Sequence, residues 1–148
     1  MKTTIGQLFL KELIAEETST RKCLERVPES LYKWKPHEKS MELGYLVLLV
    51  ADIPKWLSVS IEQGTIDLAT WEKRPLTTTQ DLLSYFSENM EGAKKVFERV
   101  TDETLENEMF YLKMNGQELM KSSKLDTISS SINHCVHHRG QLTVYMRL

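Results

Sequence analysis

A nearly continuous apolar segment, LGYLVLLVA at residues 43–51, most constrains how this chain can fold. A helix that is apolar on almost every side is stable only when several neighbouring elements cover it. The segment is also far shorter than the about 20 apolar residues that a membrane-spanning helix needs. The sequence therefore predicts a buried helix with an N-cap at Ser40, Glu42 in its first turn and a stop near Gly64.

Three further segments show the 3.6-residue periodicity of amphipathic helices, at residues 4–27, 78–100 and 126–148. Thr78 with Asp81 matches a capping box, and Asp126 is the predicted cap of the last helix. The chain is therefore expected to contain four helices.

Four such helices, without the alternating strands that an α/β fold requires, predict an all-α fold. We expect a four-helix bundle that forms a single domain, residues 1–148, with a long crossover between the third and fourth helices. Residues 64–77 are expected to be a loop, and Asn115-Gly116 is a candidate for the turn of a tight hairpin.

Glu16 and Thr20 interrupt the apolar stripe of the first helix. Buried carboxylates are rare, which favours a central turn that is partly in contact with water. The alternative is a polar pocket between the helices.

Charge and cysteine usage narrow the classes of function. The formal net charge is −2, with no basic stripe of the kind that nucleic-acid binding requires. The first residues lack the features of a signal peptide, and Cys23 and Cys135 do not form a CxxC pair. We therefore expect a cytoplasmic protein without nucleic-acid or membrane partners.

Histidines are concentrated in SINHCVHHRGQL, residues 131–142. His134 and His138 are spaced so that both lie on one face of a helix, whereas His137 points about 100° away from His138. Two such imidazoles can bind one divalent metal ion, but a site for chemistry needs at least a third protein ligand. Without a metal, the pair would form a hydrogen-bonded network with neighbours such as Gln141.

Two segments carry a resemblance to a known family. NHCVHHRGQLTVYMR, residues 133–147, resembles the C-terminal helix of the DinB-like (DinB/YfiT) four-helix-bundle superfamily, and WKPHEKSMELGYLVLLVADIPKW, residues 34–56, resembles its second helix. The resemblance implies the family's bundle fold and a homodimer. It also implies a divalent metal, commonly zinc or nickel, held by one histidine on the second helix and by the HxxxH pair, here His134 and His138.

The family's ligand position on the second helix falls at Leu49, which has no lone pair to give to a metal. Asp52, three residues later on the same helical face, is the better substitute ligand, ahead of Tyr45 and Glu16. His37 precedes the helix and is expected to lie too far away. The resemblance therefore implies a metal site that is degenerate at position 49.

Two functions follow as hypotheses. The first is a non-catalytic bundle that binds a small apolar or thiol ligand in the vacated pocket. The alternative is a metal-dependent enzyme, similar to the family's thiol S-transferases and hydrolases, that uses His134, His138 and a substitute ligand. No catalytic residue is assigned, because Cys135 is predicted to point away from the histidine face.

Overall fold

The computed structural model describes residues 2–148, and within them the chain is mostly helical, with a small sheet of three strands. The four long helices are α1, Ile5–Glu25; α2, Leu43–Glu62; α3, Thr79–Arg99; and α5, Lys124–Tyr145. The shorter elements are η1, Glu29–Leu31; α4, Asp102–Asn107; β1, Thr65–Asp67; β2, Met109–Met114; and β3, Gln117–Ser123. All four predicted helices are present and the mainly helical fold is confirmed, but the all-α class must be corrected to include a small sheet of three strands.

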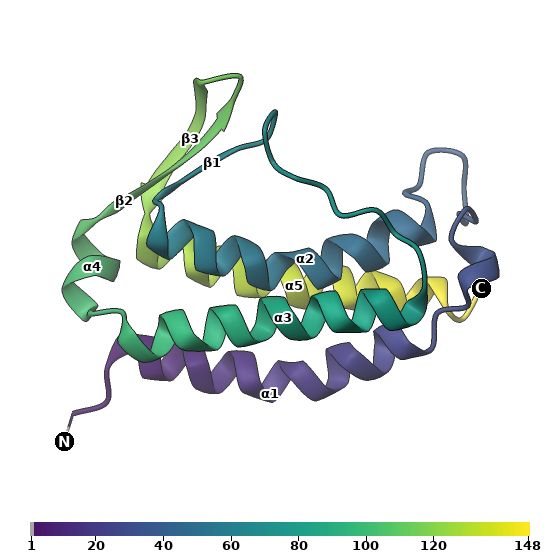
Figure 1. Ribbon diagram of the computed structural model, residues 1–148, viewed down its shortest axis with the longest axis horizontal. Helices are drawn as coiled ribbons and strands as arrows, with labels where there is room; N and C mark the ends of the chain where they lie inside the picture. The colour runs from purple at the N-terminus through teal and green to yellow at the C-terminus, as the bar shows by residue number, and fades with distance from the viewer. Residues whose placement is uncertain (1) are drawn as a thin grey trace.

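The long helices lie side by side, with the sheet and a long connection on the outer side of α2 (Figure 1). Both α1 and α2 pack against α3 and α5. Because α2 and α3 run in the same direction, the chain between them, residues 63–78, must return along the length of the helices (Figure 1). This segment is the crossover, so its predicted place between the third and fourth helices is wrong. α3 and α5 run in opposite directions and are joined at one end by α4 and the β2–β3 hairpin (Figure 1).

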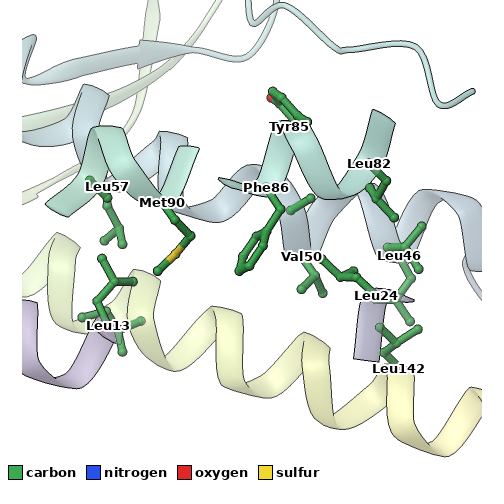
Figure 2. Packing of buried hydrophobic residues seen from close by; sticks show 14 of the residues in the cluster. Leu13, Leu24, Leu46, Val50, Leu57, Leu82, Tyr85, Phe86, Met90 and Leu142 are labelled. Carbon is green, nitrogen blue, oxygen red and sulfur yellow. The ribbon is translucent and has the colours of Figure 1, made fainter. Parts of the chain in front are cut away.

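The space between the long helices is filled by apolar side chains (Figure 2). Val50 and Leu57 of α2, Phe86 of α3 and Leu142 of α5 are all at most 1% exposed. Burying each side chain of this size contributes about 1.5–3 kcal/mol. By length and composition α2 could also cross a membrane, yet 56% of its most apolar window is buried inside the protein. Its central position in the core accounts for its hydropathy.

Two predicted helix caps are wrong, for different reasons. α2 begins at Leu43 rather than after Ser40, because the backbone N–H groups of Leu43 and Gly44 donate to carbonyls of the preceding connector, each at 2.8 Å. α5 begins after Ser123, whose hydroxyl accepts from the Asp126 N–H at 3.0 Å. Asp126 is therefore in the first turn and not at the cap. The cap predicted at Thr78 is confirmed.

The sheet fixes the hairpin beside the crossover. β1 pairs in parallel with β2, and β2 pairs antiparallel with β3. The predicted turn at Asn115-Gly116 is confirmed, with φ values of 51° and 78°, as a tight hairpin turn needs. The Asp67 carboxylate at the end of β1 accepts hydrogen bonds from both turn N–H groups, at 3.0 and 2.7 Å. The hairpin tip is thereby tied to the start of the crossover.

Candidate ligand-binding cleft at the paired histidines

A cleft of about 550 Å³ opens between α2, α5, the crossover and the tip of the hairpin. One continuous face of α2 forms its first wall, because residues three and four apart on a helix point the same way. The α2 side chains in this wall are Tyr45, Leu48, Leu49, Asp52 and Trp56.

The other walls come from parts of the chain that are distant in sequence. The crossover contributes Trp71, Lys73 and Arg74, and α5 contributes His134 and His138. The cleft therefore combines apolar and aromatic walls with a few polar groups, which is the usual character of a small-molecule site.

His134 and His138 are brought together as their spacing predicted. Their Nε2 atoms are 2.6 Å apart, and His138 Nδ1 lies 2.6 Å from Gln141 Oε1. Because Gln141 Oε1 can only accept, His138 Nδ1 carries a hydrogen, and His138 Nε2 accepts from His134 Nε2. His134 Nδ1 then keeps its lone pair.

The electrostatic surroundings favour the neutral form of His134. Its pKa is lowered chiefly by the partial burial of its ring against the cleft wall, and then by the nearby His138 and His137. His138 itself is only 8% exposed, whereas His134 is an exposed residue. The two rings thus form a hydrogen-bonded pair at the cleft, with His134 as its more exposed member.

The groups around the two histidines do not make a three-ligand metal centre. Leu49 lines the same cleft and offers no donor atom. Both Asp52 oxygens accept hydrogen bonds from other residues. Within residues 2–148 no three His, Cys, Asp or Glu side chains are grouped closely enough to hold a metal ion. Two imidazoles alone do not fit a catalytic zinc site, which usually keeps three protein ligands.

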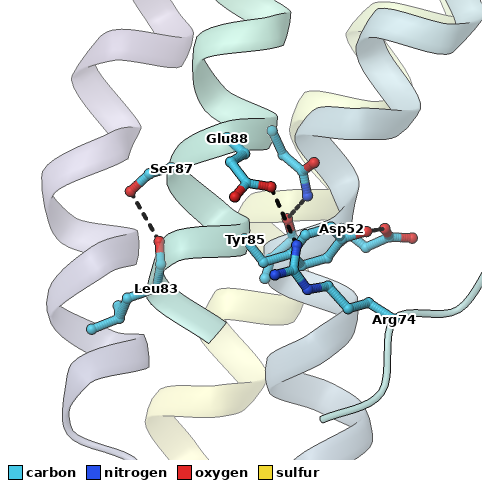
Figure 3. A network of polar contacts seen from close by, with 8 residues as sticks. Asp52, Arg74, Leu83, Tyr85, Ser87 and Glu88 are labelled. Atoms are coloured by element: carbon cyan, nitrogen blue, oxygen red, sulfur yellow. Dashed lines mark hydrogen bonds and ion pairs between the residues drawn. The ribbon is translucent and has the colours of Figure 1, made fainter. Parts of the chain in front are cut away.

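Asp52 instead anchors the crossover to the helices. One of its oxygens accepts from the indole N–H groups of Trp56 and Trp71, each at 2.9 Å, and the other accepts from the Tyr85 hydroxyl of α3. Burial, followed by the contact with Asp52, raises the pKa of Tyr85, so this hydroxyl stays a donor. Figure 3 shows Asp52 and Tyr85 together, with Arg74 reaching toward Tyr85 and Glu88.

The aromatic anchor was not evident from the sequence. Trp71 lies in the polar stretch ATWEKRP, where no periodicity indicates what its ring contacts. In the structure its ring is 5.2 Å from the Trp56 ring, centroid to centroid, and Arg74 lies 4.7 Å from the Tyr85 centroid. A lone tryptophan in an otherwise polar loop was the single available signal, because so large an apolar ring is usually packed against something.

The remaining candidate ligands lie elsewhere. Glu16 forms an ion pair with Arg139 of α5, and Arg139 also donates to the Thr20 hydroxyl at 3.2 Å. The two polar residues of the first helix therefore take part in a polar contact between α1 and α5. Thr20 is buried and Glu16 is half-buried there, so this turn is only partly in contact with water. His37 is exposed and accepts from the Lys39 N–H. Cys135 borders a small interior space beside Glu16 and Phe86.

The protein is a mostly helical one with a histidine pair on its last helix. The pair faces a cleft that is also bordered by a long crossover. The family model of the DinB family matches residues 1–148, so the chain belongs to the DinB family. The predicted resemblance is confirmed.

Known proteins show the same fold at low sequence identity. The crystal structure of the DinB-like protein YjoA from Bacillus subtilis is similar, with a TM-score of 0.74 and 21% identity over 95% of this chain and 90% of that one. A DinB-like protein from Bacillus cereus ATCC 10987 has a TM-score of 0.70 and 23% identity, covering 99% and 93% of the two chains. In sequence alone, the uncharacterized protein YjoA of Bacillus subtilis strain 168 is 22% identical, over 94% of this chain and 87% of its own length.

Proposed function

We propose that this DinB-family protein is a non-catalytic four-helix bundle that binds a small, largely apolar molecule in the cleft above His134 and His138. The observation that carries the proposal is the composition of the cleft. Leu48, Leu49 and Trp56 supply an apolar wall, while the two histidines bond to each other and to Gln141.

The size and lining of the cleft support a small-molecule ligand. Its volume of about 550 Å³ is within the range of ordinary ligand pockets. The lone pair of His134 Nδ1 offers one directional contact at the wall. Apolar surface that the ligand removes from water would supply most of the affinity, at about 25 cal/mol per Å² before the costs of association.

The experiment is a titration with N-phenyl-1-naphthylamine, a neutral aromatic probe whose fluorescence rises in apolar surroundings. The variant Leu49→Trp places a larger ring in the cleft and is expected to abolish binding. Leu8→Trp is the matched control, because Leu8 is 54% exposed on α1 and does not line the cleft. Equal binding by both variants and the parent would overturn the proposal. Circular dichroism verifies that each variant is folded.

A metal-dependent enzyme, of the thiol S-transferase or hydrolase type, is the second candidate. The convergence of two Nε2 atoms at 2.6 Å favours it, since both could turn toward one cation. Metal content is measured by mass spectrometry on protein purified without chelator, beside His138→Ala and Leu49→His. Near-stoichiometric metal in the parent that is lost in His138→Ala would favour the enzyme. An empty parent with a filled Leu49→His variant would favour a site disabled at position 49.

A further inference from the structure

We infer that the ligand of this cleft is an amphipathic organic anion, with an aromatic or aliphatic body and one carboxylate or sulfonate group. The inference rests on the proposed function and adds the charge class of the ligand. It depends on where the cleft places its charges and on which of them already have partners.

The crossover places two cations at the cleft, Lys73 and Arg74. Within residues 2–148 Lys73 forms no ion pair or hydrogen bond, and it is exposed at the rim. Arg74 has one acidic partner, Glu88, at 3.2 Å, and 65% of the Glu88 side chain is exposed. An ion pair this open to water holds its cation weakly, so Arg74 is available to a ligand as well.

The acidic group of the lining does not face a ligand in the same way. Among the described residues Asp52 is the one carboxylate in this wall, and its oxygens accept from two indole N–H groups and the Tyr85 hydroxyl. Two cations and one carboxylate line the cleft, and the carboxylate is the group whose lone pairs are already used. Lys73, which has no acidic partner among residues 2–148, is therefore the group that can pair with an acidic group of a ligand.

A cationic ligand is disfavoured by the same contacts. Aromatic rings near a carboxylate can form a site for an ammonium group. Here cations of the protein itself already lie over these rings. Lys55 Nζ is 4.9 Å from the Trp71 centroid, and the Arg74 guanidinium is 4.7 Å from the Tyr85 centroid.

Depth in the cleft separates the two halves of the ligand. His138 and the leucine wall are the more buried part, and Lys73 is exposed. The apolar body would therefore lie against Leu48, Leu49 and Trp71, with the acidic group at Lys73. Tyr45 lies in the same wall and is 52% exposed, so its hydroxyl can donate to the anion.

A matched pair of probes tests this inference. 1-Anilinonaphthalene-8-sulfonate has the ring system of N-phenyl-1-naphthylamine with one added sulfonate, so the two differ chiefly in charge. We expect the sulfonate probe to bind at least about fivefold more tightly, as one accessible ion pair allows. Lys73→Gln should remove most of that difference and leave the neutral probe unchanged. Lys11→Gln, the same change at an exposed position on α1, is the control.

The outcomes separate this inference from the function on which it rests. If both probes bind equally in the parent, and Lys73→Gln affects neither, the anion preference is wrong while ligand binding stands. If neither probe binds, or if Leu49→Trp fails to displace them, the cleft is not a ligand site and both proposals fail. A preference that disappears in high salt and in Lys73→Gln alike would support an ionic contact at the rim.

Discussion

Two polar clusters lie on α5 and differ in where their partners come from. In the interface cluster, Arg139 contacts Glu16 and Thr20 of α1, so its partners belong to another helix. In the histidine cluster, His134, His138 and Gln141 contact one another within α5. A polar group paired across an interface holds two helices together, whereas a cluster paired along its own helix does not link that helix to another. We therefore expect the first cluster to contribute more to stability, whereas the ligand contact that we propose lies at the second.

The largest expected effect concerns Cys135, which adjoins the interface cluster. Burial raises the pKa of its thiol to about 11, so almost none of it is thiolate at pH 8. We expect iodoacetamide to modify Cys135 roughly a hundredfold more slowly in the native protein than in urea, because the thiolate is the reactive form. Peptide mass spectrometry gives the rate. Rapid native labelling would mean that this interface opens readily.

Arg139→Ala should lower the free energy of unfolding by about 2 kcal/mol, because the largely covered Glu16 and Thr20 lose their partner. Gln141→Ala should cost less than about 1 kcal/mol, since its contact lies within one helix. Urea denaturation measures both, and Arg147→Ala at an exposed position is the control. Equal losses in the two clusters would contradict the distinction between them.

Asp52→Ala should lower stability by about 1.5 kcal/mol, because the Trp71 indole and the Tyr85 hydroxyl lose their acceptor. The crossover would then be held less firmly, and trypsin should cleave after Lys73 faster than in the parent protein. Asp52→Asn keeps one acceptor oxygen and should be intermediate in both assays. A trypsin rate unchanged by either substitution would show that Asp52 does not anchor the crossover.

The smallest effect is a pH dependence from His134. Because its pKa is lowered in the folded state, the unfolded chain takes up the proton first as the pH falls below about 6.5. This contribution to stability is complete above that pH and is lost progressively as the pH falls from there through the lower pKa of the folded state. Unfolding free energies at pH 7.5 and 5.5 should differ less in His134→Gln than in the parent, and the exposed His37→Gln should behave as the parent. Identical pH dependence in all three proteins would show that folding does not lower the pKa of His134.

Local sequence signals predicted the helices, the cap at Thr78 and the turn at Asn115-Gly116, because each depends on residues within a few positions of one another. The same signals could not show the short strand β1, since three residues give no periodic pattern and their stability comes from pairing with β2. The Ser40 cap was mistaken for a related reason: the first N–H groups of α2 donate to the connector's backbone, which side-chain chemistry does not show.

The sequence by itself determined that His134 and His138 share a face, that position 49 carries a leucine, and that four helices bury an apolar centre. All of these follow from helical geometry and residue chemistry. Only the tertiary structure decided that Asp52 serves Trp71 and Tyr85, that Arg139 reaches across to α1, and that the crossover runs between α2 and α3. These contacts join residues 19, 33 and 119 positions apart. Which residues form these contacts depends on how whole helices pack, because no local pattern shows which distant side chain will meet a polar group.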